Sequence, residues 1–153
     1  MKLLNLTPHV SLLLLGSGLF SLLAAQRAKP MSLEQTLQAS EWKKRVLLIA
    51  APTAEHADFR AQKALLAKAQ SQLDERDFLV LDVLYDQLPA TDKQYLTNKI
   101  GVNPSRFAAV LIGKDGGVKM KSARPIAPAA LFGTVDKMPM RKHEMQRGVV
   151  DTD

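Results

Sequence analysis

The stretch LIGKDGGVKMK, residues 111–121, decides the fold, because it is either a glycine-rich phosphate cradle or the turn of a β-hairpin. A P-loop places Gly-x-x-x-x-Gly-Lys-Ser/Thr between a strand and a helix, whereas these glycines precede alternating apolar and basic residues typical of a strand. Lys114 stands before the glycines, where it cannot act as the terminal lysine of that motif. Asp115, Gly116 and Gly117 supply the backbone conformations of a tight turn. The stretch therefore predicts an antiparallel hairpin.

Two apolar runs upstream of this hairpin predict further strands, with a helix between them. RVLLIAAP (45–52) and DFLVLDVL (77–84) have the length and composition of strands buried on both faces. Thr53 stands at the expected N-cap of a long helix that continues to Glu75. A strand–helix–strand unit makes a right-handed crossover, so we expect these two strands to pair in parallel. The inward stripe of the helix is predicted to comprise Gln62, Leu65, Leu66, Ala69 and Leu73.

The remaining elements complete a mixed α/β order. SLEQTLQAS (32–40) carries a capping box and predicts a first helix, and a short helix is expected from Thr91 to Lys99, closed by Gly101. Strands at 106–113 and 117–121 form the hairpin, and helices at 128–138 and 139–147 follow it. The resulting order is β-α-β-α-β-β-α after one extra helix. A mixed four-stranded sheet with helices on both faces, the thioredoxin-like fold, is the simplest arrangement that accommodates this order.

The first 25 residues predict a signal peptide. Lys2 gives a positive start, and residues 10–25 form an apolar run shorter than the roughly 20 residues of a membrane-spanning helix. The run ends in two alanines of the kind that a signal peptidase accepts, although Leu23 stands where a small residue is usual. An uncleaved membrane anchor is therefore the alternative. We expect an exported protein, periplasmic or secreted, with one domain over 26–148 and a frayed tail over 149–153.

Composition and charge restrict the chemistry and the partners. The chain has no cysteine, which excludes disulfides, thiolate metal sites and a cysteine nucleophile. Its formal net charge is +6, and residues 106–147 hold nine Lys or Arg against three Asp or Glu. The positive field therefore lies in the second half of the domain. Outside the cytoplasm we expect an envelope protein or an anionic envelope component as partner, and no nucleic acid; a merely soluble basic surface is the alternative.

Four blocks of the sequence resemble one protein family. EWKKRVLLIAAP, ERDFLVLDV, FAAVLIGKDGGVKMKS and DKMPMRKHEM are similar to the signature blocks of the uncharacterised family catalogued as domain of unknown function 4174. The resemblance spans Leu33 to Arg147, and GKDGGVK together with DxMPMRxxEM is far more specific than a glycine-rich match alone. It implies a thioredoxin-like fold, exported bacterial relatives and related domains in extracellular-matrix and sushi-repeat proteins. The family has no established activity.

The residues of a thiol-exchange site are missing. Catalytic thioredoxins place a cysteine at the N-terminus of the helix after the first strand, where the helix dipole stabilises the thiolate. Here that stretch is APTAEHADF (51–59), in which Thr53 and His56 are the only reactive side chains. We expect Thr53 to cap the helix and His56 to be solvated, with a base or metal ligand as the alternative. The approach to the third strand also lacks the thioredoxin cis-proline, since Ala108 stands near that position. Thiol–disulfide catalysis is therefore excluded.

The remaining candidate residues are cations, with one indole beside them. The candidate binding residues are Trp42, Arg45, Lys114, Arg141, Lys142 and Arg147. Arginines beside exposed methionines can clamp carboxylates or phosphates; in the alternative, the methionines pack on the sheet, the cations are solvated and the indole covers the core. The run from Asp74 to Asp77 is expected to be a solvated turn with Arg76 as its counterion. No cofactor or metal is expected, because the histidines are few and scattered.

Two functional hypotheses follow. The first is a non-catalytic binding or scaffold module of the cell envelope that uses a basic C-terminal surface. The second is a cysteine-independent enzyme that acts near Thr53, His56 and Lys114 on a small anionic metabolite. The absent cysteines and the uneven charge favour the first hypothesis.

Overall fold

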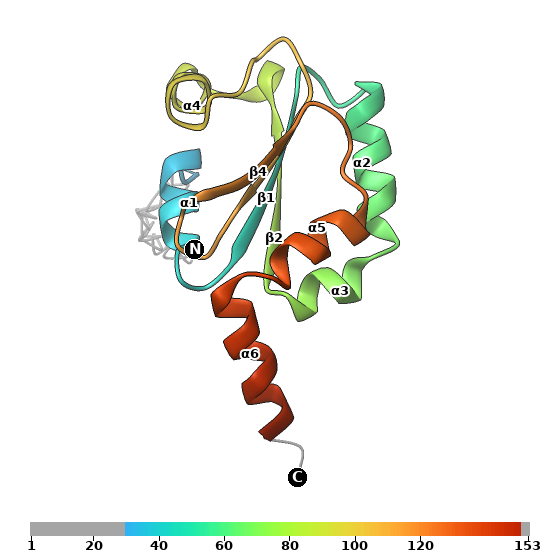
Figure 1. The fold of residues 1–153 in the computed structure, drawn as a ribbon. Coiled ribbons are helices and arrows are strands. Elements are labelled where there is room, and N and C mark those ends of the chain that lie inside the picture. Colours follow the sequence, from blue (N-terminus) through green and yellow to red (C-terminus); the bar gives the residue numbers. More distant parts are fainter. Residues whose placement is uncertain (1–29, 151–153) are drawn as a thin grey trace, which may run out of the picture.

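A four-stranded mixed sheet forms the centre of the computed structural model, which describes residues 30–150 (Figure 1). β1 (Arg45–Ala51) pairs in parallel with β2 (Phe78–Leu84) and antiparallel with β3 (Ala108–Ile112). β3 in turn pairs antiparallel with β4 (Val118–Ser122), which gives the strand order β2-β1-β3-β4. The parallel crossover and the hairpin predicted from the sequence are both confirmed, and the fold is thioredoxin-like.

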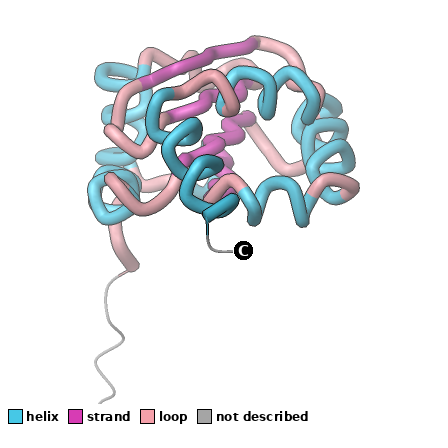
Figure 2. Tube along the Cα trace, turned by 60° about the horizontal axis from the view of Figure 1, so that its bottom comes forward, coloured by secondary structure: helices cyan, strands magenta, loops and turns pink. Residues whose placement is uncertain are grey.

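Helices cover both faces of this sheet, as Figures 1 and 2 show. On one face lie α1 (Leu33–Ser40), α4 (Ala90–Tyr95) and its π-helical continuation η2 (Leu96–Ile100). On the other face lie α2 (Ala57–Ala67), α3 (Gln70–Glu75) and α5 (Pro128–Val135). A 3₁₀ turn, η1 (Tyr85–Gln87), follows β2, and α6 (Pro139–Val150) extends away from the sheet beyond α5.

The alternation of side chains along β1 divides the core into two apolar clusters. Leu47 and Ile49 pack with residues of α2, α3 and α5, whereas Val46 and Leu48 pack with residues of α1 and η2. Every residue of β1 is buried. The continuous apolar run in the sequence is therefore explained by a central strand with a helical layer on each side.

The β3–β4 connection is a tight turn rather than a phosphate cradle. Gly116 has a φ of +75°, and the Gly113 amide donates to the carbonyl of Gly117 at 2.9 Å. The Asp115 carboxylate accepts a hydrogen bond from the Gly117 amide at 3.1 Å, which closes the turn locally. A Cβ atom at Gly116 would lie 2.8 Å from a carboxylate oxygen of Glu41. The backbone conformation favours glycine there, whereas the exposed Glu41 side chain could move aside for a Cβ atom.

The helix after β1 begins later than predicted and is broken once. Thr53 does not cap it: the carbonyl of Thr53 accepts the amide of His56 at 3.3 Å in a turn, and α2 starts at Ala57. Because Pro52 and the turn residues use one more turn of chain, His56 takes the N-cap position, without a side-chain capping bond. The predicted continuous helix is interrupted at Ala69, whose φ of −123° lies outside the helical range.

Other helix predictions agree with the structure more closely. Ser32 and Gln35 form the complete capping box of α1. Gly101, with a φ of +71°, ends η2 as predicted. α6 reaches Val150, beyond its predicted end at residue 147.

The expected signal peptide, residues 1–25, lies outside the described residues. Within residues 30–150, every peptide bond is trans and no helix has the length and apolar character needed to cross a bilayer.

Gln62 provides a test of the packing between α2 and the chain before α5. Its side chain is fully buried, accepts a hydrogen bond from the Ile126 amide at 2.7 Å and donates one to the Ile126 carbonyl at 3.1 Å. We predict that Gln62→Leu lowers the free energy of unfolding by about 2 kcal/mol or more, because both backbone groups of Ile126 lose their partner in the core. Urea denaturation followed by circular dichroism measures this loss. The exposed Gln72→Leu variant is the control, and an equal effect of both changes would contradict the prediction.

Candidate functional site

The residues singled out by the sequence lie at opposite ends of the sheet. Thr53 and His56 follow the C-terminal end of β1, at the position of a thioredoxin active site. Arg45 and Lys114 lie at the other end, where β1 begins and the β3–β4 hairpin turns, and Arg141 reaches that end from α6.

The turn of Thr53 and His56, which corresponds to a thioredoxin active site, is called the former redox position. It holds a partly buried imidazole. The His56 ring is half-buried and stacks on Phe107, with ring centroids 6.2 Å apart and an interplanar angle of 18°. Its Nδ1 atom is buried and has no hydrogen-bond partner among the described residues. His56 is therefore not the solvated side chain that we expected. Neither Glu55 nor Asp58 hydrogen-bonds to it within the described chain, so no carboxylate orients the ring as a base.

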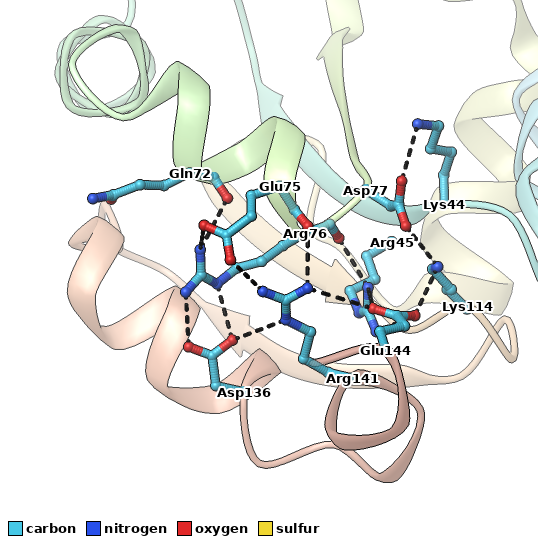
Figure 3. Close-up of polar contacts among 10 residues, drawn as sticks. All are labelled: Lys44, Arg45, Gln72, Glu75, Arg76, Asp77, Lys114, Asp136, Arg141 and Glu144. Atoms are coloured by element: carbon cyan, nitrogen blue, oxygen red, sulfur yellow. Dashed lines mark hydrogen bonds and ion pairs between the residues drawn. The ribbon is translucent and has the colours of Figure 1, made fainter. Parts of the chain in front are cut away.

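At the opposite end, charged side chains form a continuous network, which we call the ionic cluster (Figure 3). Its members are the cations Arg45, Arg76, Lys114 and Arg141 and the carboxylates Glu75, Asp77, Asp136 and Glu144. They come from the start of β1, the α3–β2 junction, the hairpin, the end of α5 and helix α6. The cluster therefore joins five segments, and most of them are far apart in the sequence.

Glu144 is the shared acceptor of one half of the cluster. Both terminal nitrogens of Arg45 donate to its two carboxylate oxygens at 3.1 Å, and Lys114 Nζ donates to Oε1 at 2.8 Å. Arg45 is only 1% exposed and also donates to the carbonyl of Arg76 at 2.9 Å. Lys114 Nζ has a second partner, the carboxylate of Asp77, at 2.8 Å. Two nearly buried cations thus share one carboxylate from α6, and Lys114 has Asp77 as a second partner.

Asp136 is the corresponding acceptor of the other half. Arg76 donates to both of its oxygens at 2.9 Å, and the same guanidinium lies over the ring of Phe132 at 4.7 Å. Arg141, 7% exposed, donates to Asp136 at 3.4 Å and to the carbonyl of Glu75 at 3.1 Å, and it also bonds the Glu75 carboxylate. These contacts attach the first turn of α6 to the end of α3.

The cations hold the pKa values of three carboxyl groups below their ordinary range. The hydrogen bond from Lys114 lowers the pKa of Asp77, and the hydrogen bond from Arg76 lowers that of Asp136. Burial by itself would raise the pKa of Glu144, but the hydrogen bonds from Arg45 and Lys114 outweigh it and the net shift is downward. All three groups are therefore more strongly acidic in the folded chain than in the unfolded chain.

The structure assigns the candidate binding residues to two groups. Arg45, Lys114 and Arg141 are buried and paired with carboxylates of the chain itself, whereas Lys142 and Arg147 are exposed. The expected turn from Asp74 to Asp77 is confirmed in part, since Glu75 is exposed and Arg76 pairs with it at 3.2 Å. The last three residues are more than a solvated turn, because Asp136, Lys114 and Arg141 bring further partners to them and make them part of the ionic cluster.

Trp42 is neither a lid on the core nor part of the cluster. Its side chain is 66% exposed, and its backbone has a φ of +63°, a conformation rare for a bulky residue. The amide of Trp42 donates to the carbonyl of Lys114 at 2.5 Å, so the turn before β1 is fixed to the hairpin. The indole is therefore presented to solvent beside a rigid turn.

Asp136 and Glu144, the two carboxylates at the centre of the cluster, were not among the site residues predicted from the sequence. Both lie in the DxMPMRxxEM block, in which Arg141 and Glu144 are three residues apart on one helical face. The available signal was the helical spacing of Arg141 and Glu144, together with an arginine, Arg45, at the start of a buried strand. Such an arginine needs a carboxylate partner. Which partners they take could be seen only once the five segments were assembled.

A cavity of about 380 Å³ lies beside the ionic cluster, between the hairpin and the junction of α5 with α6. Arg45 and Lys114 line it together with Lys137 and the apolar residues Met138 and Met140. Within residues 30–150, no three His, Asp or Glu side chains converge in a way that could hold a metal ion. The chemistry of this end of the molecule is thus that of fixed cations beside an apolar cavity.

A family model described as "Domain of unknown function (DUF4174)" matches residues 36–144 of the chain. All eight residues of the ionic cluster lie within the matched range. The match therefore covers the sheet, the hairpin and the start of α6 together.

Curated relatives are similar at a lower level. The chain is 28% identical over 141 residues to coiled-coil domain-containing protein 80 of Danio rerio, and 29% identical over 114 residues to the human sushi repeat-containing protein SRPX. These alignments cover 76% and 67% of the chain but only 16% and 25% of the two relatives. The chain thus corresponds to a small part of each relative.

Among solved structures, Plasmodium yoelii Prx1a matches with a TM-score of 0.51 and 20% sequence identity. The match covers 71% of this chain and 80% of the Prx1a chain. At this identity the likeness concerns the fold alone.

Removing the charge of Glu144 tests whether the cluster is structural. We predict that Glu144→Gln lowers the free energy of unfolding by about 2–4 kcal/mol, because Arg45 and Lys114 become buried cations without sufficient compensation. Gln146→Ala, on the exposed face of the same helix, is expected to change it by less than about 0.5 kcal/mol. Both variants are compared by urea denaturation. Equal stability of Glu144→Gln and the unaltered chain would show that the cluster does not stabilise the fold.

The lowered carboxyl pKa values also predict an acid-dependent loss of stability. A group with a lower pKa in the folded state stabilises the fold above its unfolded-state pKa, and this contribution disappears as the pH falls through the folded-state value. The free energy of unfolding should therefore decrease below the ordinary values of 4.5 for Glu144 and 3.8 for Asp77 and Asp136. Denaturation curves between pH 7 and pH 2 measure the slope. Glu144→Gln should show a shallower slope, and an unchanged slope would contradict the assignment of Glu144.

Proposed function

The chain belongs to the DUF4174 family, and we propose that it is a non-catalytic binding module of the cell envelope that engages an anionic partner through α6. The observation that carries this proposal is the two-sided character of that helix. One side, with Arg141 and Glu144, is held in the ionic cluster, while the other presents cations and methionines to solvent. The helix is thus a rigid support for an exposed basic surface.

The exposed side of α6 has the composition of an adaptable binding surface. Lys142, His143 and Arg147 are exposed, and Met140 and Met145 are 37% and 39% exposed. Methionine side chains adapt to partner surfaces, and adjacent cations attract carboxylates or phosphates. Figure 1 shows α6 extending from the body of the domain, where a large partner can approach it. We call this set of five residues the α6 surface.

The sequence supports the cellular part of the proposal. The apolar N-terminal segment of residues 10–25 has the pattern of a signal for export, which directs a protein to the envelope or beyond it. In that compartment, acidic polymers, anionic headgroups and acidic protein surfaces are the available partners of a basic helix. Electrostatic attraction to such partners weakens as salt is added.

The alternative, a cysteine-independent enzyme at the former redox position, has weaker support. The observation in its favour is the buried Nδ1 of His56, which has no hydrogen-bond partner within residues 30–150. Thr53 and His56 share a turn through backbone atoms, yet no side-chain hydrogen bond between them occurs in the described part of the chain. Lys114, the third residue of that hypothesis, belongs to the ionic cluster at the opposite end of the sheet. Binding through the α6 surface is therefore the function that the geometry supports best.

Charge reversal on the α6 surface tests this function. We predict that the double variant Lys142→Glu, Arg147→Glu loses at least about nine-tenths of the capture of an anionic partner from envelope extract at low salt, because four units of charge change on the binding face. Mass spectrometry identifies the captured component, and binding to the purified component is then titrated against salt.

The matched control is Lys68→Glu, Lys99→Glu, which makes the same charge change at exposed positions of other elements. It should retain capture, because we expect binding to depend on the charges of the α6 surface and not on the net charge of the chain. Equal capture by both double variants, or capture that does not weaken with added salt, would remove the α6 surface from consideration.

A further inference from the structure

The cavity beside the ionic cluster has the size of a small-molecule site. Its volume of about 380 Å³ lies within the range of roughly 300–1,000 Å³ that is typical of ligand pockets. Met138, Pro139 and Met140 give it an apolar wall at the α5–α6 junction, and Gly113 and Lys119 of the hairpin region form the opposite side. The cavity shares Met140 with the α6 surface but not its cations, since Lys142 and Arg147 do not line it.

The charges around the cavity leave a surplus of positive charge. Its cationic lining residues are Arg45, Lys114, Lys119 and Lys137. Glu144 compensates Arg45, Asp77 bonds Lys114 at 2.8 Å, and Asp115 bonds Lys119 at 2.6 Å. Lys137 is exposed and makes no ion pair or side-chain hydrogen bond within residues 30–150. One cation at the edge of an apolar cavity is therefore available to a single negative charge.

Arg45 gives a second, independent indication of a ligand. The residue is 1% exposed and lines the cavity, and its Nε atom has no hydrogen-bond partner in the described chain. A buried guanidinium N–H without an acceptor is destabilising, because the loss of its hydration is not compensated. An acceptor oxygen brought into the cavity could relieve this deficit after a small movement of the lining side chains.

From these observations we infer that the cavity binds a small amphipathic monocarboxylate. Its carboxylate lies toward Lys137 and the Arg45 side of the cavity, and its apolar body packs against Met138 and Met140. A single negative charge matches Lys137, the one lining cation without an ion pair within residues 30–150, and methionine side chains adjust to ligands of varied shape. This site does not depend on the macromolecular binding proposed for the α6 surface.

The probe for this inference is octanoate, with 1-octylamine as the cationic molecule of equal chain length. In a titration of the full-length chain followed by NMR, octanoate should cause saturable shifts of the backbone amides of Gly113, Asp115 and Met138. The amine should cause none at the same concentrations, because its ammonium group is repelled by the uncompensated charge of Lys137. Absence of saturable octanoate shifts at these amides, or equal shifts with the amine, would overturn the inference.

Substitutions of Lys137 locate the carboxylate. Lys137→Glu should weaken octanoate binding by about tenfold, since a favourable charge becomes a repulsive one, whereas Lys137→Arg should bind as the unaltered chain does. Both changes are at an exposed position, and thermal unfolding like that of the unaltered chain would show that they leave the fold intact. Octanoate binding that Lys137→Glu does not weaken would place the carboxylate elsewhere and overturn the site.

Lys142→Glu, on the α6 surface, is the matched control and should bind octanoate normally. The same variants separate this inference from the proposed function. The double variant Lys142→Glu, Arg147→Glu should lose most of the partner capture but bind octanoate normally. Lys137→Glu should retain partner capture but bind octanoate more weakly. Loss of octanoate binding in Lys142→Glu would show that the two surfaces are not separate, against the inference.

Discussion

The bidentate contact between Arg45 and Glu144 is the interaction that holds together the end of the sheet where β1 begins and the β3–β4 hairpin turns. Arg45 is the first residue of the central strand and is almost completely buried, so its charge must be matched inside the protein. Glu144 supplies the match from the C-terminal helix, 99 residues further along the chain. Because the same carboxylate also binds Lys114, the strand, the hairpin and the helix are positioned by a single side chain.

This constraint explains how a thioredoxin-like domain can be organised without a redox centre. The position that carries a catalytic cysteine in thioredoxins holds Thr53 and a stacked His56, and no thiol exists anywhere in the chain. The extended network of charged side chains, the ionic cluster, lies at the other end of the sheet. Functional contacts are therefore expected around α6 and its junction with α5, rather than at the N-terminus of α2.

The sequence was sufficient for the sheet and insufficient for the cluster. β1, β2 and the hairpin are encoded locally, by apolar runs and by the Asp115–Gly117 turn, and these were predicted correctly. The predicted helix start at Thr53 was wrong, because threonine occurs both at helix N-caps and in turns. Only the path of the chain distinguishes the two positions. Arg45, Lys114 and Arg141 were recognised as notable cations, but pairing across 30 to 99 residues has no local signature.

The exposed Trp42 has a practical consequence for anyone who follows this protein in solution. It is the only tryptophan of the chain, and it already faces water in the native state. Its emission therefore reports the surroundings of the turn at Lys114 rather than the integrity of the interior, and the usual red shift on denaturation has little room to occur. In this protein, a tryptophan emission wavelength that does not change during denaturation would therefore not show that the sheet has stayed folded.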